Sequence, residues 1–248
     1  MRFSVEGDAR FLSHHETLRA LELAAVRAEL PLKYSQGFNP HPILSLPAPR
    51  PVGVSSGREL LVLALEAPRR AEEVLVSLVA QAPRGVRFLQ AEALPSKGTP
   101  LPSRADYALP LGPADAQRVQ RRLAELRQVP TWPVERWTSP KGRRRGAREV
   151  RVIDIKPMIA DVAVEGGHLR WSAVPRGDTW ARPGDVLKLL GLDERVALAE
   201  VVRTAVEYAD RAPGGHGQSD DASAGASEAR PDDNNPTTGH THAKENAD

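Results

Sequence analysis

Apolar and polar positions in the first ninety residues alternate between a strand-like and a helical spacing. Residues 2–6 alternate residue by residue, which predicts a strand. His14, Leu18 and Leu21 follow the i, i+4, i+7 spacing of one helix face, within a helix expected at 14–29. Three more strands are expected within 32–46, at 59–66 and at 86–93, with a second helix at 69–81. This β-α-β-β-α-β order predicts an α+β fold with an N-terminal ferredoxin-like unit.

The second half of the chain predicts a second, smaller α+β unit. Strands are expected at 107–111, 132–137, 150–155, 160–165 and 169–174, and helices at 113–126, after Arg182-Pro183 and at 196–208. Proline is common in the first turn of a helix, which favours the start at Pro183. The expected organisation is a first domain at 1–94, a proline-rich linker at 95–105, a second domain at 106–209 and a tail at 210–248.

The tail differs from the rest of the chain in composition. From residue 211 onward it has no large apolar side chain, so it cannot offset the entropy of ordering, and we expect it to be disordered. Residues 210–248 contain eight acidic and three basic residues, a net charge of −5. Because the whole chain carries +2, residues 1–209 carry +7, which is a weak indication of a polyanionic partner.

The absence of cysteine from the 248 residues excludes several kinds of site. Disulfides and cysteine-ligated zinc are excluded, and so is an iron–sulfur cluster held by the thiolates of this chain. No apolar run reaches the roughly 20 residues of a membrane-spanning helix, and residues 1–10 lack the apolar core of a secretory signal. We therefore expect a cytoplasmic protein that does not bind a membrane.

The residues most capable of chemistry lie between Arg10 and Pro49. Ser13-His14-His15-Glu16 has the S-x-x-E form of a capping box, which fixes the first turn of the helix. The following loop, residues 34–42, is stiffened by two prolines and carries several polar and aromatic side chains. We expect helix start and loop to form one substrate- or partner-binding site, made by His14, Tyr34, Gln36, Phe38, Asn39 and His41. The alternative is that His14 is a satisfied structural histidine.

This stretch also carries a family resemblance. F-L-S-H before the helix, Y-S-Q-G-F-N-P-H-P after it, and the later Val52-Gly53-Val54-Ser55 and Glu59 resemble the bacterial radical SAM-linked protein family. His15 and Glu16 depart from the Leu and Asp usual in that family. Members of the family are domains of unknown function found beside or fused to cobalamin-binding radical S-adenosylmethionine (SAM) enzymes. The resemblance therefore implies a radical SAM enzyme as partner.

A catalytic role is the competing interpretation. His14 or His41 could act as acid or base with Glu16 as orienter, and together with His15 these side chains are the metal-like ligand set of the folded part. However, His14 and His15 diverge by about 100° on a helix, so both could not easily join His41. No nucleophile elbow, phosphate-binding loop or dinucleotide fingerprint is present. We expect no catalytic residue, no metal and no cofactor held by the chain itself.

A basic run and four tryptophans raise the possibility of nucleic-acid binding. The run consists of Lys141, Arg143, Arg144, Arg145 and Arg148, a composition typical of phosphate-binding segments. An acidic protein surface would fit it as well, and the tryptophans are expected in the core because most have strand-like neighbours. The resulting prediction is a non-catalytic companion of a cobalamin-dependent radical SAM enzyme that binds or presents a substrate, with RNA as the candidate.

Overall fold

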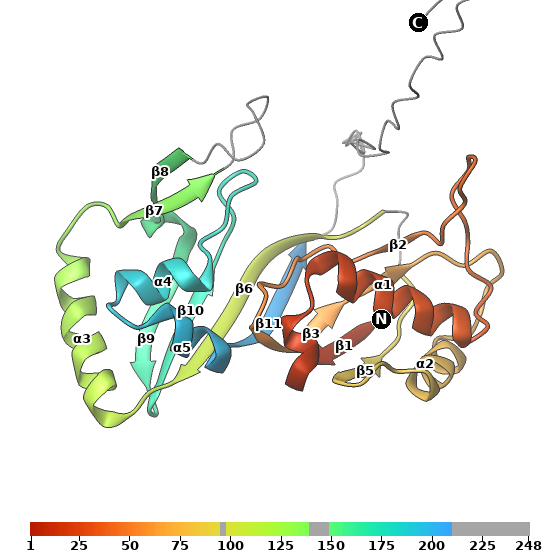
Figure 1. Ribbon diagram of the computed structural model, residues 1–248, viewed down its shortest axis with the longest axis horizontal. Coiled ribbons are helices and arrows are strands. Elements are labelled where there is room, and N and C mark those ends of the chain that lie inside the picture. Colours follow the sequence, from red (N-terminus) through yellow and green to blue (C-terminus); the bar gives the residue numbers. More distant parts are fainter. Residues whose placement is uncertain (95–97, 139–148, 210–248) are drawn as a thin grey trace, which may run out of the picture. The chain divides into compact units, whose positions relative to one another are not determined.

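The computed structural model describes residues 1–94, 98–138 and 149–209 as a mixed α+β arrangement around one large sheet (Figure 1). The strand order in this seven-stranded sheet is β5-β1-β3-β11-β6-β10-β9. The bounds are β1 (Arg2–Val5), β3 (Ser55–Leu60), β5 (Val86–Gln90), β6 (Leu101–Pro110), β9 (Ile159–Glu165), β10 (His168–Ala173) and β11 (Val202–Ala209). β3 and β11 pair in parallel, and the other neighbours pair antiparallel. One sheet therefore contains strands from both halves of the chain.

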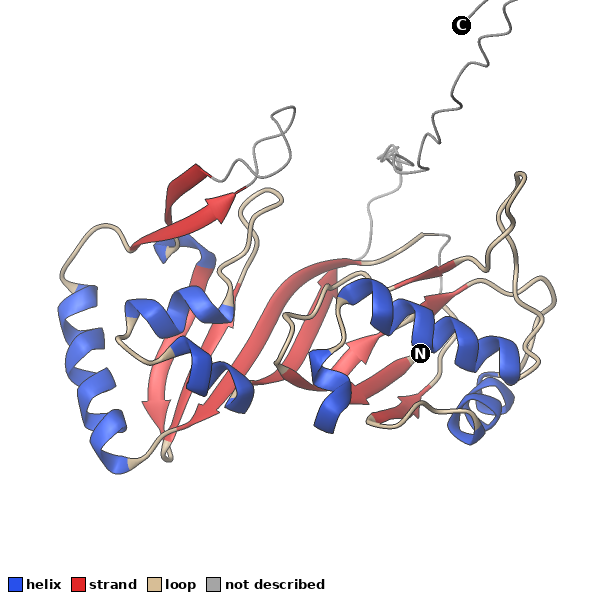
Figure 2. Ribbon diagram, in the orientation of Figure 1, coloured by secondary structure: helices blue, strands red, loops and turns tan. Residues whose placement is uncertain are grey.

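Two short sheets and several helices accompany the large sheet (Figure 2). β2 (Leu44–Ser45) pairs with β4 (Val62–Leu63), and β7 (Pro133–Thr138) pairs with β8 (Glu149–Asp154). The α-helices are α1 (His14–Arg27), α2 (Ala71–Ala80), α3 (Pro113–Arg127), α4 (Pro183–Leu189) and α5 (Glu194–Ala197). Short 3-10 turns are η1 (Gly7–Phe11), η2 (Lys156–Met158) and η3 (Leu198–Glu200).

The helical stripes bury their apolar faces in two clusters. In the N-terminal half, Leu21 of α1 and Leu78 of α2 pack with Phe3 and Val5 of β1. In the C-terminal half, the cluster joins side chains of α3, α4, β6 and β10, namely Val119, Leu123, Leu187, Leu109, Leu169 and Trp171. β11 and β6, at the middle of the sheet, connect the two regions through their pairing.

Most expected elements are confirmed, including the capped helix, which ends at Arg27 ahead of Pro31. The helix expected at 196–208 is wrong, because Val202–Ala209 forms β11. Its register with β6 shifts twice, after Arg203 and after Glu207. Because of the first shift, Arg203 and Val206 are both buried although they are three residues apart in the sequence. Such a spacing is typical of one face of a helix.

The finer ferredoxin-like arrangement stays a prediction. β1 lies antiparallel between β3 and β5, but β2 and β4 form a sheet of their own and β3 also pairs with β11. Residues 101–105, expected in the linker, form the first half of β6. The expected tail, 210–248, lies outside the described residues. Among the residues that are described, the helices are too short or too polar to cross a membrane.

Candidate functional site

The start of α1 is fixed by the capping box that the sequence predicts. Ser13 Oγ accepts from the backbone N–H of Glu16 at 3.3 Å, and Glu16 Oε2 accepts from the backbone N–H of Ser13 at 2.8 Å. These bonds with Ser13 lower the pKa of the Glu16 carboxyl, because they favour its charged form. The carboxylate of Glu16 thus serves the helix cap.

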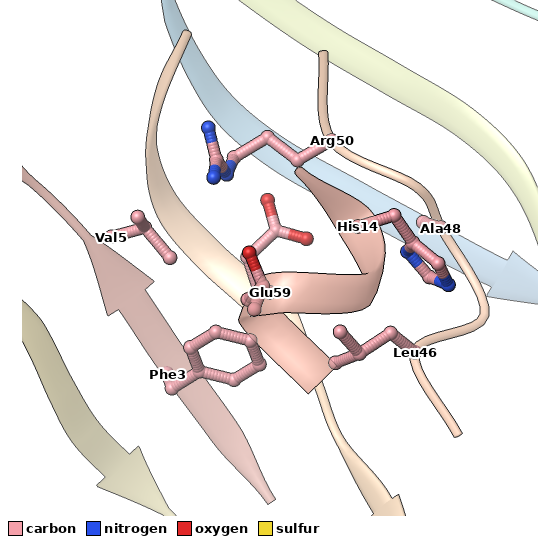
Figure 3. A pocket seen from close by; sticks show the side chains of 8 residues that line it. Phe3, Val5, His14, Leu46, Ala48, Arg50 and Glu59 are labelled. Carbon is pink, nitrogen blue, oxygen red and sulfur yellow. The ribbon is translucent and has the colours of Figure 1, made fainter. Parts of the chain in front are cut away.

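His14, in the first turn of α1, lines a small cavity beside β1 and β3 (Figure 3). The cavity measures about 10 Å³, room for about one water molecule. Its other walls are Phe3, Val5, Thr17, Leu46, Ala48, Arg50 and Glu59. Burial lowers the pKa of His14, and the neighbouring His15 lowers it further. This cavity has room for a solvent molecule but not for a substrate.

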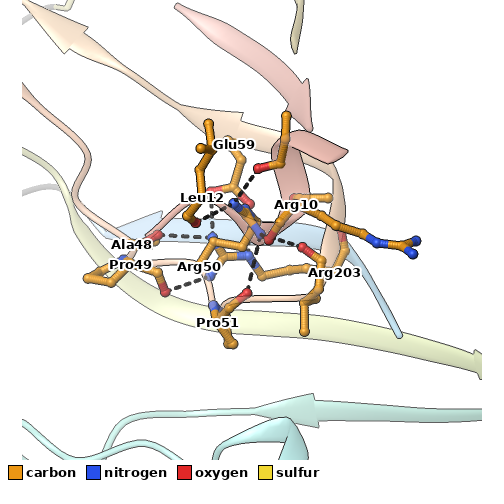
Figure 4. Close-up of polar contacts among 11 residues, drawn as sticks. Arg10, Leu12, Ala48, Pro49, Arg50, Pro51, Glu59 and Arg203 are labelled. Carbon is orange, nitrogen blue, oxygen red and sulfur yellow. Dashed lines mark hydrogen bonds and ion pairs between the residues drawn. The ribbon is translucent and has the colours of Figure 1, made fainter. Parts of the chain in front are cut away.

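A buried charge cluster lies at the edge of this cavity (Figure 4). Arg203 of β11 forms a two-pronged ion pair with Glu59 of β3, with Nε donating to Oε1 at 2.9 Å. Arg203 also donates to the carbonyl oxygens of Ala48 at 2.9 Å and Pro49 at 3.2 Å. The pair thereby ties the 48–49 segment and two central strands together.

Arg50 adds a second cation to the same cluster. Its guanidinium donates to backbone carbonyls of η1 and of its own loop, including those of Arg10 and Val54 at 2.6 Å each. Burial lowers the pKa of Arg50, while Glu59 acts in the opposite direction. Two guanidinium groups and one carboxylate leave this cluster with a positive charge.

A much larger cleft adjoins the same cluster. Its volume is about 730 Å³, within the range of small-molecule and cofactor sites. Tyr107 of β6 and Arg203 of β11 form part of its lining, together with the segments 48–51, 135–137 and 180–185. Ala48 and Arg50 line both the cleft and the small cavity.

A second buried ion pair forms another part of the cleft lining. Arg136 of β7 pairs with Asp185 of α4, with side-chain exposures of 6% and 10%. Arg136 also donates to the carbonyl of Trp180 at 2.6 Å, and Asp185 accepts from the backbone N–H of Arg182 at 2.8 Å. One arginine therefore links the β7–β8 hairpin to the start of α4.

The expectation that the tryptophans are core residues is confirmed for three of the four, since Trp180 packs against the C-terminal cluster, and is wrong for Trp137. Trp132 and Trp171 are buried, and Trp171 stacks on Tyr107 with a ring separation of 5.1 Å. Trp180 is half-buried and Trp137 is 67% exposed, and both line the cleft. The cleft therefore presents aromatic surface to whatever enters it.

Comparison with protein families matches residues 1–182 to an uncharacterized protein conserved in bacteria (DUF2344). The chain belongs to this family. A search of curated proteins found no match. The DUF2344 match includes the helix start, the loop, Arg50, Glu59 and Arg136, whereas Asp185 and Arg203, the partners of two of them, follow the matched residues.

The predicted loop of this DUF2344 chain is exposed and held by its own contacts. His41 Nδ1 lies 3.0 Å from Ser35 Oγ, and Ser35 Oγ accepts from the backbone N–H of His41 at 3.2 Å. Tyr34 forms a bridge with Pro42, and the Phe38 side chain is fully exposed. Gln36, Asn39 and His41 are exposed as well.

The structure does not show His14 and the loop as one pocket. His14 is the first residue of α1, whereas the loop extends beyond the other end of that helix, about 20 Å away at 1.5 Å per residue (Figure 1). The cavity residues that surround His14 include none of the loop residues. His14 and the loop therefore lie apart, and a joint role for them stays a prediction.

The remaining predicted residues concern metal and nucleic acid. Within the described ranges, no three histidine, aspartate or glutamate side chains are grouped as a metal site. Lys141, Arg143, Arg144, Arg145 and Arg148 lie outside the described residues, in the segment between β7 and β8. Their nucleic-acid role stays a prediction.

Sequence reasoning missed the cleft and its two ion pairs. One signal was available, because Glu59 begins the run ELLVLALE, which is apolar up to Glu66, and a charge in a buried strand requires a partner. The partner itself, Arg203, is 144 positions away and could not be identified from local spacing.

Proposed function

We propose that this chain is a non-catalytic binding protein that holds a substrate for a cobalamin-dependent radical SAM enzyme. The observation that carries the proposal is the cleft of about 730 Å³, with aromatic surface and charged groups fixed by buried ion pairs. Glu16 is engaged in the helix cap and His14 lines a cavity for one water. These placements favour binding over acid–base chemistry.

The radical SAM partner rests on the resemblance carried by the helix start and by Y-S-Q-G-F-N-P-H-P. In this proposal the exposed loop with Tyr34, Gln36, Phe38, Asn39 and His41 contacts the enzyme. A fully exposed phenylalanine on a loop that is braced by internal hydrogen bonds suits such contact, since aromatic anchors dominate interface energies. The absence of cysteine fits a companion that leaves the iron–sulfur chemistry to its partner.

The N-terminal half is proposed to be a variant of the ferredoxin-like arrangement. The order β5-β1-β3, with β4 continuing the chain of β3 and pairing with β2, follows the strand sequence of that fold. In this variant the third strand bends after Leu60, so its two ends belong to different sheets. Many RNA-binding proteins share this arrangement, an analogy that adds only modest weight to RNA as the substrate.

Co-purification tests the partnership. The affinity-tagged full chain, expressed in its native host, should retain an enzyme that carries cobalamin and an iron–sulfur cluster, visible by absorbance and mass spectrometry. Phe38→Ala should reduce the amount retained without changing the melting temperature, because this side chain contacts solvent alone in the isolated protein. Val76→Ala, an equally apolar change at a 70% exposed position of α2, serves as the control. Recovery of the chain without such an enzyme would contradict the proposal.

A further inference from the structure

The exposure of Trp137 requires an explanation beyond packing. The β7–β8 register places Trp137 opposite Val150 and Glu135 opposite Val152, so these residues share one face of the hairpin. Trp137 and Val152 are each 67% exposed and Val150 is 40% exposed. Apart from Glu135, the side chains named on this face are apolar and open to solvent, a feature of binding surfaces. Because Trp137 also lines the cleft, the face and the cleft adjoin.

Trp180 supplies the second aromatic surface of the cleft. Its side chain is half-buried and its carbonyl accepts from Arg136, which is itself ion-paired with Asp185. The backbone that carries Trp180 is therefore held by the same contact that fixes β7, the strand of Trp137. Trp180 also packs against the C-terminal core, so both indoles line the cleft from backbone segments that Arg136 connects.

The charges around these indoles favour a phosphate-bearing ligand. Arg136 and Arg203 are neutralised by Asp185 and Glu59, so they stabilise the cleft rather than attract a ligand. Arg182 and Lys188 are exposed and line the cleft, so they are its most accessible cations, and the buried Arg50 lines it as well. Glu135 and Glu194 also line the cleft, and their carboxylates repel anions. A phosphate group should therefore bind close to Arg182 and Lys188.

We infer that the cleft binds single-stranded RNA, with bases stacked on Trp137 and Trp180 and backbone phosphates contacting Arg182 and Lys188. This inference rests on the proposed binding role and names the substrate class. Stacking on aromatic side chains beside basic groups is the general mode of single-strand binding, and it tolerates any base because each has a π-face. The open hairpin face that continues from Trp137 suits a strand longer than one nucleotide.

Fluorescence anisotropy of a labelled oligouridine of about ten nucleotides with the full-length chain tests this inference, since single-strand sites span about 4–16 nucleotides. Trp137→Ala should weaken binding about 5- to 150-fold, the effect of losing one stacked base, and Trp137→Phe should retain most of the affinity. Trp137 is exposed, so the variant should melt as the parent does. Lys188→Gln should lower the salt slope by about 0.7, as expected for one single-strand phosphate contact.

Controls separate the cleft from other sources of RNA affinity. Val76→Ala should bind RNA as the parent does. Replacing Arg143, Arg144 and Arg145 together with alanine should leave the effect of Trp137→Ala intact. Parent-like binding by Trp137→Ala, no binding of RNA at all, or equally tight binding of uridine monophosphate would each overturn the inference. Co-purification of the radical enzyme is a separate measurement. A failure of RNA binding would therefore overturn the RNA inference without overturning the proposed companion role.

Discussion

Arg203 and Glu59, 144 positions apart in the sequence, form a buried ion pair between β11 and β3. Their side chains are 3% and 6% exposed. The pair lies where the only parallel neighbours among the described strands meet, and it adjoins both the His14 cavity and the cleft. This ion pair adds to the β3–β11 pairing in connecting the last described strand to the region that carries the family resemblance.

Breaking this pair from one side should strongly destabilise the fold. Glu59→Ala leaves the guanidinium of Arg203 buried without its carboxylate, a change that typically costs about 3–5 kcal/mol of unfolding free energy. Urea unfolding measures the loss. The double variant Glu59→Leu with Arg203→Met should recover part of it, because the guanidinium of Arg203 is then no longer buried without its carboxylate, whereas the buried guanidinium of Arg50 remains.

The pair Arg19–Glu22 on α1, with side-chain exposures of 63% and 21%, provides the solvent-accessible control. Glu22→Ala should cost less than about 1 kcal/mol, since exposed ion pairs are screened by water and salt. Equal losses for Glu59→Ala and Glu22→Ala would show that the buried pair does not secure the centre of the sheet.

Local signals in the sequence were sufficient for the helix start and insufficient for the cleft. Ser13 and Glu16 are three residues apart and bond each other, so their spacing alone predicts the contact that the structure contains. Arg136 and Asp185 are 49 positions apart, and the fold alone brings them together. A histidine can be recognised as a candidate acid, base or metal ligand from its residue type alone. A buried ion pair between distant residues cannot be recognised in this way, so both ion pairs were missed.

The strand β11 was mistaken for a helix for a related reason. Val202 and Val206 have the i, i+4 spacing of a helix face, and the alternation that would identify a strand is interrupted by register shifts. Pairing with β6 and β3, which are distant in sequence, decides the conformation. Strand preference depends on such neighbours more than helix preference does.

The capping box should contribute measurably to stability. Ser13→Ala removes the acceptor for the Glu16 N–H and should cost about 1 kcal/mol. Ser13→Asp should retain most of the stability, because aspartate caps helices about as well as serine. Thermal unfolding of both variants tests the cap, and the same loss for both would contradict this account.

Gly85 should not tolerate a side chain. Its φ is +80°, and a Cβ would lie 2.6 Å from the carbonyl oxygen of Glu6 and 2.8 Å from the Cβ of Ala9. Gly85→Ala should therefore destabilise the protein by more than the roughly 1 kcal/mol expected for a left-handed backbone alone. Gly177, with φ +57° and nothing within 4 Å of a Cβ, is the control. The difference between the two alanine variants measures the steric contact at the β5 turn.

The pH dependence of stability should report on His14. Burial, and then the charge of His15, lowers the pKa of His14 from 6.5 in the folded protein. Just below pH 6.5 the unfolded chain therefore binds this proton more tightly, so acidification favours unfolding. The stability contribution is complete above pH 6.5 and is lost as the pH falls toward the folded-state pKa.

Urea unfolding between about pH 5 and pH 8, the range in which histidines titrate, measures this contribution. His14→Gln should flatten the rise in stability toward pH 6.5 relative to the parent. His15→Gln should flatten it less, because it removes the secondary cause and leaves the burial of His14 in place. A profile for His14→Gln that is parallel to that of the parent would mean that the His14 ring is hydrated in solution and is not held against the residues that surround it in the structure.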